Sequence, residues 1–203
     1  MQKLEVINIL KNDLNFSDDS IKKLTKFTNL VLEENKNYNL IAKSTENQIW
    51  TRHVLDSAQL VKFIDFSSNS LSDLGTGAGF PGLVVEIFNK NRAFHVKLYE
   101  KSPVKRQFLL RVIKELRLNA VVLGDIRQEK LDSDIIICRA FKKLDYVMQV
   151  SREIAKKPHK LIILKGQNAQ QELNKTFKNE KYPYKLETSI TSNESKIILM
   201  NIS

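Results

Sequence analysis

The first part of the chain has a hydrophobic pattern that predicts helices. Leu24, Thr28 and Val31 recur at the spacing of one helix face. Ser17 precedes this face as a candidate N-cap, and the two aspartates that follow it suit the positive end of a helix. Residues 49–63 predict one or two further helices. We therefore expect the N-terminal region to form a helical cap.

In the rest of the chain, short apolar runs alternate with amphipathic segments, as in proteins whose strands alternate with helices. The expected strands cover residues 71–74, 94–99, 120–123, 135–138, 161–164, 184–190 and 196–202. The expected helices cover residues 81–88, 103–116 and 144–155, with one more after residue 166. This alternation predicts a mostly parallel sheet with helices on both faces. The last two strands have no helix between them, so we expect an antiparallel pair at one end of the sheet. The chain thus divides into a helical cap, residues 1–65, and an α/β domain, residues 66–203.

A glycine-rich turn follows the first expected strand. Its sequence is Asp73-Leu74-Gly75-Thr76-Gly77-Ala78-Gly79-Phe80-Pro81-Gly82. Ligands of parallel α/β sheets bind outside the carboxyl ends of the strands, where glycines let the backbone approach the ligand closely. A P-loop would need Gly-Lys followed by Ser or Thr, and the turn has no such sequence. We therefore do not expect hydrolysis of ATP or GTP.

Two ligand classes remain for this turn. Gly77, Gly79 and Gly82 satisfy the G-x-G-x-x-G pattern of dinucleotide-binding proteins, which favours a nicotinamide-dependent oxidoreductase. Asp73 and the next three glycines satisfy D-x-G-x-G-x-G, which resembles the first motif of class I methyltransferases. S-adenosyl-L-methionine carries an ammonium group that suits the charge of Asp73. We therefore expect S-adenosylmethionine to be the cofactor.

Two further acidic residues stand where the second and third strands are expected to end. Glu100 ends the second strand, where methyltransferases and dehydrogenases alike use a carboxylate to accept hydrogen bonds from ribose hydroxyls. Asp125 ends the third strand, where many methyltransferases contact adenine. Each residue could instead be a solvated turn residue. Glu100 alone does not separate the two ligand classes.

The charge of the chain is strongly positive and unevenly distributed. The formal net charge is +10. Residues 1–60 carry eight basic and eight acidic side chains, whereas residues 61–203 carry 25 basic and 15 acidic ones. A basic main domain indicates a polyanionic partner such as nucleic acid. The alternative is compositional drift, because the chain is rich in Lys, Asn and Ile.

Cysteine and histidine usage argues against disulfides and metal sites. Cys138 is the only cysteine, and His53, His95 and His159 lie far apart without ligand spacing. No apolar run reaches the ~18 residues of a membrane span. Polar residues interrupt the apolar stretch at the N-terminus, so we do not expect it to be a signal peptide. We expect a cytoplasmic protein with no metal and no membrane partner.

Several short motifs accompany the glycine-rich turn. They are Asn39-Leu40, Arg52-His53-Val54-Leu55-Asp56-Ser57, Lys105-Arg106-Gln107-Phe108-Leu109, Arg139-Ala140-Phe141 and Leu164-Lys165-Gly166. Together they resemble the RsmG family (also called GidB), the bacterial 16S rRNA guanine-N7 methyltransferases, over about residues 37–166. The resemblance implies a seven-stranded, class I Rossmann-like methyltransferase fold behind a helical cap. It also implies 16S rRNA, naked or within the 30S subunit, as the partner.

The resemblance further implies a set of cofactor-binding positions. By position these are Gly75, Phe80, Ile126, Arg127 and Arg139. Ile126 and Arg127 would act largely through their backbone. The segment Glu100-Lys101-Ser102-Pro103 departs from the family, which often has a different acidic segment there.

The implied target atom needs no general base. Guanine N7 is nucleophilic at neutral pH because its lone pair lies in the ring plane, so the enzyme needs in-line placement of N7 and the methyl group. Arg139, directly after the fourth strand, could hold a guanine or a phosphate. Its alternative is a salt bridge to Asp73, Glu100 or Asp125. Lys165 ends the fifth strand and could bind phosphate or be a solvated lysine. Arg139 and Lys165 are our candidate catalytic residues.

Basic side chains near this face form a candidate RNA-binding rim. They are Lys101, Lys105, Arg106, Lys142 and Lys143, each of which alone could be a solvated charge. His53 and Asp56 stand three residues apart and would share a helix face. They could orient the substrate, or they could make a structural contact that joins the cap to the main domain.

Other functions remain open at this point. No Asn/Asp-Pro-Pro-aromatic motif follows the fourth strand, which argues against methylation of an exocyclic amine. Cys138 lies within an expected strand, which argues for a core position and against a thiolate mechanism. The alternatives are a methyltransferase for tRNA or a small molecule, a nicotinamide-dependent oxidoreductase, and a cofactor-binding protein without activity.

Overall fold

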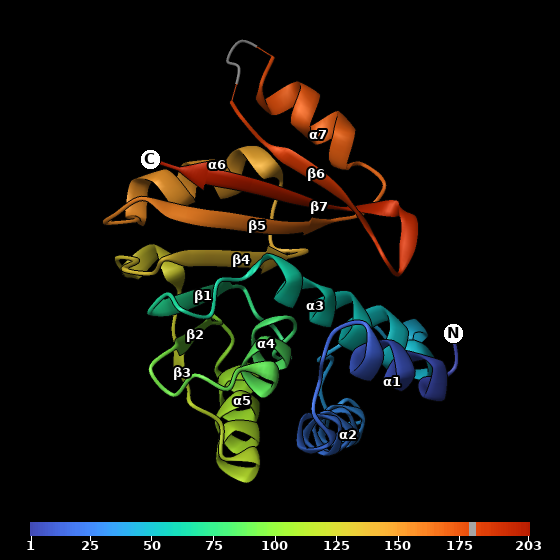
Figure 1. Cartoon of the computed structure of the whole chain (residues 1–203). Coiled ribbons are helices and arrows are strands. Elements are labelled where there is room, and N and C mark those ends of the chain that lie inside the picture. The colour runs from blue at the N-terminus through green and yellow to red at the C-terminus, as the bar shows by residue number, and fades with distance from the viewer. Residues whose placement is uncertain (179–181) are drawn as a thin grey trace.

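The computed structural model describes residues 1–178 and 182–203 and is built on a seven-stranded sheet (Figure 1). Its strands are β1 (Ser70–Leu74), β2 (His95–Tyr99), β3 (Ala120–Leu123), β4 (Ile135–Arg139), β5 (His159–Lys165), β6 (Lys185–Ser189) and β7 (Ser192–Ile202). The strand order is β3-β2-β1-β4-β5-β7-β6. Strands β1 to β5 pair in parallel, and β7 pairs antiparallel with both β5 and β6. This confirms the predicted mostly parallel sheet with an antiparallel pair at one end.

The helices of the main domain begin and end close to the predicted positions. They are α4 (Gly82–Phe88), α5 (Pro103–Leu116), α6 (Leu144–Ile154) and α7 (Ala169–Thr176), and a short helix that was not predicted, η4 (Ile126–Gln128), follows β3. Helices α4 and α5 pack on one face of the sheet, and α6 and α7 pack on the other. The central strands β1, β4 and β5 bury side chains on both faces, as in a parallel sheet covered on both sides. Cys138 is buried in β4, where desolvation raises the pKa of its thiol to about 12, so the core interpretation is confirmed.

The cap consists of two long helices followed by a series of short ones. They are α1 (Lys3–Asn12), α2 (Asp18–Glu34), η1 (Lys43–Gln48), η2 (Trp50–Leu55), α3 (Asp56–Ala58) and η3 (Gln59–Phe63). Ser17 caps α2 as predicted, because its Oγ accepts a hydrogen bond from the Ser20 backbone N at 3.1 Å. The segment predicted as one or two helices contains π-type turns at η2, a geometry often found at functional sites.

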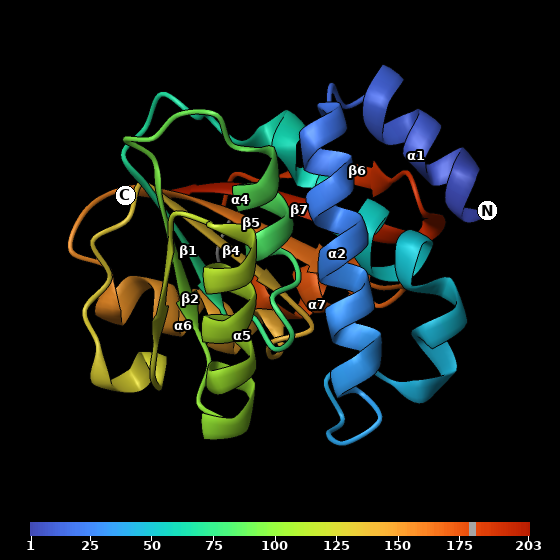
Figure 2. The same ribbon diagram turned by 90° about the horizontal axis from the view of Figure 1, so that it is seen from below.

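The cap packs directly against the main domain. Helix α2 runs alongside α4 and α5 (Figure 2). Phe27 of α2 contacts Phe80 of the glycine-rich turn, with the two ring centroids 4.8 Å apart. A single cluster of buried side chains extends from the cap into the α4 and α5 face of the sheet. The cap is therefore held next to the carboxyl ends of the strands.

Residues 1–178 and 182–203 contain neither a membrane-spanning helix nor a cluster of metal ligands. None of their helices is long and apolar enough to cross a membrane. Nor do three His, Cys, Asp or Glu side chains gather there as ligands for a metal ion.

Candidate active site

Two adjoining cavities lie at the carboxyl ends of the parallel strands. The larger cavity, of about 760 Å³, lies over the ends of β1, β2 and β3. The smaller cavity, of about 560 Å³, lies between the cap and the ends of β4 and β5. Ala140, Lys142 and Lys143 line both cavities. The segment that follows β4 therefore separates the two spaces.

The larger cavity is lined by half of the residues predicted to bind a cofactor, together with part of the predicted basic rim, whereas Gly77 and Gly79 of the predicted set do not line it. The lining residues of the two sets are Gly75, Glu100, Lys101, Lys105, Asp125, Ile126, Arg127, Lys142 and Lys143. They come from separate strand ends that the parallel sheet brings to one edge, where ligands of such sheets bind.

Gly75 lines the larger cavity with its backbone, next to the ring of Phe141. Its φ angle is +70°, a conformation that favours glycine, and a Cβ atom at this position would collide with the ring of Phe141. The backbone of the turn therefore meets a flat ring directly.

Glu100 shapes the glycine-rich turn from the end of β2. Its Oε2 accepts a hydrogen bond from the Gly77 backbone N at 3.0 Å, and its Oε1 accepts one from the Ser102 backbone N at 2.8 Å. A carboxylate offers about four acceptor sites, so Glu100 can still accept hydrogen bonds from two hydroxyl groups. The residue thus suits a ligand that contains a ribose.

Asp125 and Arg127 form an ion pair at the end of β3. The Arg127 guanidinium lies 2.6 Å from an Asp125 carboxylate oxygen, and its hydrogen bonds to Asp125 lower the pKa of that carboxyl to about 2. The Ile126 side chain between them is buried. This edge combines an apolar wall with a fixed carboxylate, which suits a purine base.

Asp73 does not line the larger cavity, although its position in the motif predicts a carboxylate facing the cofactor's ammonium. It is fully buried, and its Oδ2 accepts a hydrogen bond from the Gly82 backbone N at 2.8 Å, at the start of α4. Burial raises the pKa of Asp73 to about 6. Asp73 therefore acts on the conformation of the turn through its hydrogen bond to the start of α4.

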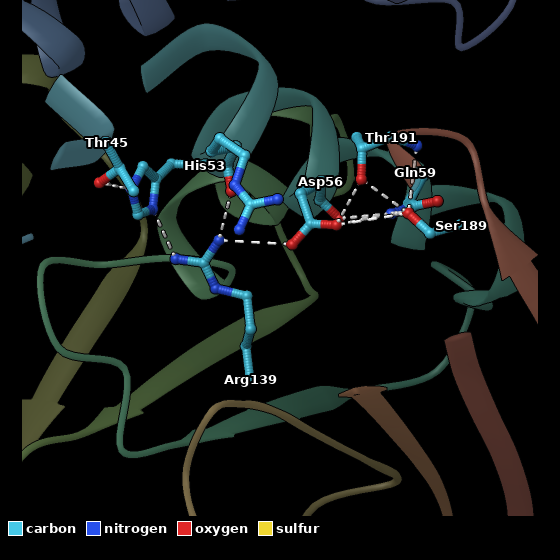
Figure 3. A network of polar contacts seen from close by, with 8 residues as sticks. Thr45, His53, Asp56, Gln59, Arg139, Ser189 and Thr191 are labelled. Carbon is cyan, nitrogen blue, oxygen red and sulfur yellow. Dashed lines mark hydrogen bonds and ion pairs between the residues drawn. The ribbon is translucent and has the colours of Figure 1, made fainter. Parts of the chain in front are cut away.

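The smaller cavity is organised around Arg139 (Figure 3). Its Nη1 donates a hydrogen bond to the Arg52 carbonyl oxygen at 3.0 Å and lies 3.5 Å from the Asp56 carboxylate. Its Nη2 donates to Nδ1 of His53 at 2.9 Å. The predicted alternative, a salt bridge to Asp73, Glu100 or Asp125, is wrong, since the partners come from the cap. Arg139 lines the smaller cavity and not the larger one, so it does not contact the predicted cofactor space.

His53 is held as a neutral acceptor. Burial, followed by the positive charges of Arg139 and Arg52, lowers its pKa to about 3. The lone pair of its Nδ1 is already occupied by Arg139. His53 and Asp56 do share a face, but they meet through Arg139 and join the cap to β4 in this way.

Phe80 also lies outside the larger cavity, although the resemblance implies a cofactor contact there. Its side chain is buried, and its ring lies 5.1 Å from the His53 ring and 5.5 Å from the Arg139 guanidinium carbon. An arginine above an aromatic face is attracted by the ring. The Phe80 ring thus packs against one face of the Arg139 guanidinium.

Lys165 is committed to protein contacts. Its Nζ donates hydrogen bonds to the Lys142 carbonyl oxygen at 2.7 Å and to Glu172 Oε2 at 2.8 Å. The same Glu172 oxygen accepts from the Leu144 backbone N at 2.7 Å. Lys165 is therefore not a solvated lysine, and it holds the segment between the two cavities.

Arg106 is the member of the predicted rim that lines neither cavity. Its Nη1 donates hydrogen bonds to the carbonyl oxygens of Glu100 and Lys101, at 3.1 and 2.8 Å. The guanidinium thus fixes the chain between β2 and α5. Lys101 and Lys105 keep their predicted place at the cavity edge.

Several residues of the site were not among the predicted site residues. Thr45, Gln59, Ser189 and Thr191 join the network around Asp56 and His53 (Figure 3). Phe141 and Tyr146 line the larger cavity. The Arg139-Ala140-Phe141 motif marks the place of Phe141, whereas the hydroxyl residues come from segments that only the tertiary fold brings together.

Comparison with known proteins places this site in a family. The family model described as rRNA small subunit methyltransferase G matches residues 20–199. A ribosomal RNA small subunit methyltransferase G from Pelagibacter ubique is 36% identical to this chain, over 96% of the chain and 92% of the relative. One of the same name from Orientia tsutsugamushi is 32% identical over 98% of each.

Solved structures show the same fold at low sequence identity. A SAM-dependent methyltransferase from Aquifex aeolicus has a TM-score of 0.58 at 14% identity and covers 74% of this chain and 91% of its own. A chain of the fibrillarin/Nop5p complex has a TM-score of 0.55 at 15% identity, with coverages of 73% and 80%. These similarities support a Rossmann-like methyltransferase fold. Because the family model and the curated relatives extend from the cap to the terminal strands, the chain belongs to the rRNA small subunit methyltransferase G family.

Proposed function

We propose that this protein transfers a methyl group from S-adenosylmethionine to guanine N7 in 16S rRNA of the small ribosomal subunit, in the cytoplasm. Membership of the family gives the activity class, an S-adenosylmethionine-dependent rRNA methyltransferase. The target atom and the division of the site into cofactor and substrate spaces are the proposed parts.

The larger cavity suits the cofactor. Gly75 would lie under its methionine part, Glu100 would accept hydrogen bonds from its ribose, and Asp125 with Ile126 would border its adenine. When bound, S-adenosylmethionine supplies an electrophilic methyl group. The chain has to hold that group facing the segment that separates the two cavities.

The observation that carries the choice of N7 is the chemistry of the smaller cavity. Its imidazole, His53, is neutral but has its acceptor nitrogen occupied by Arg139, and its Asp56 carboxylate is engaged by several donors. Such groups serve poorly as general bases. Guanine N7 needs none, because only its approach to the methyl group must be controlled.

Arg139 is the residue that we assign to guanine orientation. Its guanidinium is planar and faces the smaller cavity, so it can hold a planar base or a phosphate through paired hydrogen bonds. Arg52 has an exposed side chain on the same cavity and, like Lys142 and Lys143, suits RNA phosphates.

The decisive experiment measures methyl transfer from labelled cofactor into 30S subunits, naked 16S rRNA and tRNA in parallel. We expect incorporation into 30S subunits or 16S rRNA, and we expect chemical cleavage selective for N7-methylguanine to locate the product. Incorporation into tRNA alone, or product at an exocyclic amine, would contradict the proposal. Calorimetry with S-adenosylmethionine and with NAD tests the cofactor separately.

A further inference from the structure

The hydrogen bonds around Arg139 have a fixed direction. Arginine only donates, so Nδ1 of His53, 2.9 Å from Nη2 of Arg139, must be the acceptor. The proton of the neutral imidazole is therefore on Nε2. That nitrogen lies 2.8 Å from Oγ1 of Thr45, which must accept it.

Thr45 completes this chain of donors. Its own hydroxyl proton is directed to the Ala42 carbonyl oxygen, 2.7 Å away. Arg139, His53 and Thr45 thus each donate to the next group, and the chain ends on a backbone carbonyl of the cap. Threonine at this position selects the one histidine tautomer that can accept from Arg139.

Asp56 fixes the other side of the guanidinium. Its Oδ1 accepts hydrogen bonds from Gln59 Nε2 at 3.1 Å and Thr191 Oγ1 at 3.0 Å, and Ser189 Oγ lies 3.4 Å away. These donors leave Oδ2 facing Nη1 of Arg139 at 3.5 Å. The carboxylate is thereby oriented by a helix of the cap and by the turn between β6 and β7 (Figure 3).

We propose that Thr45, His53 and Asp56 are positioning residues that fix the plane of the Arg139 guanidinium, so that the cap is a working part of the methyl-transfer site. The proposal rests on the proposed function, because it assumes that Arg139 orients the substrate. Both edges of the guanidinium are held from the cap, while Phe80 lies against its face. These contacts restrict rotation of the guanidinium at both of its edges and on one of its faces.

The test compares two substitutions at one position. Thr45→Val keeps the shape of the side chain and removes the acceptor for Nε2, whereas Thr45→Ser keeps the hydroxyl. For Thr45→Val we expect kcat for methyl transfer to fall about tenfold, with KM for RNA and the cofactor affinity changed less than about twofold. Thr45→Ser should restore most of the rate.

Thr25→Val is the matched control. Thr25 lies in the cap on α2 and lines neither cavity, and its hydroxyl donates to the Ile21 carbonyl oxygen at 2.9 Å. Like Thr45→Val, the Thr25→Val variant loses a hydrogen bond from a threonine hydroxyl to a backbone carbonyl oxygen, but no histidine is bonded to that hydroxyl. Equal losses of kcat in Thr25→Val and Thr45→Val would mean a general weakening of the cap and would overturn the proposal, as would full activity of Thr45→Val.

A second measurement does not depend on turnover. NMR with isotope-labelled histidine should show His53 neutral with its proton on Nε2 in the wild-type protein, and Thr45→Val should lose the slow exchange of that proton. Asp56→Asn should lower kcat without changing the His53 tautomer. A proton on Nδ1 would refute the positioning chain, whereas absence of N7 methylation by the wild-type protein with the expected tautomer would refute only the proposed function.

Discussion

The two cavities are built in different ways. The larger cavity uses residues at the ends of neighbouring strands and the segments that directly follow them, all within the main domain. The smaller cavity uses contacts between residues far apart in sequence, such as Arg139 with Asp56, 83 positions away, and Thr191 with Asp56, 135 positions away. The cofactor side is thus a local property of the sheet, and the substrate side depends on the docking of the cap and the terminal hairpin.

The largest expected effect concerns the larger cavity. Gly75→Val should abolish binding of S-adenosylmethionine, because valine is strained at a φ of +70° and its branched Cβ would occupy the space now filled by the Phe141 ring. Calorimetry measures the loss directly.

The control for Gly75 is a second glycine at a strand end. Gly166→Ala places a Cβ where no atom lies within 4 Å, so cofactor affinity should be unchanged. If Gly75→Val bound the cofactor with wild-type affinity, the larger cavity could not be the cofactor site.

Arg139→Lys tests the smaller cavity without removing its charge. A lysine cannot bond the Arg52 carbonyl and His53 from one rigid plane, so we expect a loss of about 100-fold in kcat/KM, or about 2.7 kcal/mol of transition-state stabilisation. Cofactor affinity should change less than about twofold, because Arg139 does not line the larger cavity.

Arg111→Lys provides the comparison for Arg139→Lys. Arg111 pairs with Glu34 on the outside of α5, and its substitution should leave methyl transfer intact.

The pH profile of the wild-type enzyme should be nearly flat from about pH 6.5 to 8.5, because the pKa of His53 is about 3. A steep rise with pH that vanished in His53→Ala would instead make His53 a base and contradict the assignment of N7.

A smaller effect is expected where the two cavities meet. If Lys142 and Lys143 contact RNA phosphates, the double substitution Lys142→Gln and Lys143→Gln should make the salt dependence of RNA binding shallower by about 1.4, at about 0.7 per contact on single strands. Filter binding at several salt concentrations measures the slope. Lys62→Gln with Lys90→Gln, two exposed lysines outside both cavities, should leave it unchanged.

The smallest effect is on stability alone and lies outside both cavities. Glu86 of α4 is buried, and desolvation raises the pKa of its carboxyl to about 7. Its contribution to stability is therefore present below about pH 4.5 and is lost as the pH rises through about 7. The free energy of unfolding of wild type relative to Glu86→Gln should fall between about pH 5 and pH 8.

Denaturant unfolding at about pH 5 and pH 8 gives the free energy of unfolding of wild type and of Glu86→Gln. The contributions of the other titrating groups cancel in the difference, because both proteins contain them. Glu33→Gln, an exposed substitution on α2, should show no such change relative to wild type. Equal pH dependence in all three chains would disprove a buried, proton-binding Glu86.

The sequence predicted the parts of the site that depend on local structure. Each expected strand formed, so the residues that end them, such as Glu100 and Asp125, reach one edge of the sheet as periodicity and motif position indicated. Asp73 and Phe80 show the limit of a motif. A motif gives the residue type at each position of a turn, but it does not give the direction of each side chain. The side chains of Asp73 and Phe80 are buried and do not line the larger cavity.

The partners of Arg139 show a second limit. Its position after β4 was predictable, and the acidic partners nearest in the motifs were the obvious alternatives. Its actual partners, His53 and Asp56, come from a cap whose docking is decided by the packing of Phe27 and its neighbours. Hydrophobic periodicity predicts that such a helix exists but not where it docks.

The place of β7 in the sheet has a consequence for the timing of protein synthesis. This strand follows the other six along the chain, yet it lies between β5 and β6, and the end of β6 and the turn before β7 each supply a hydroxyl group that bonds Asp56. During synthesis on the ribosome, strands β1 to β3, whose ends border the larger cavity, emerge before this stretch. The hydrogen bonds from Ser189 and Thr191 to Asp56 can form only once the β6–β7 hairpin has been made and docked, so the substrate side of the site is completed after the cofactor side.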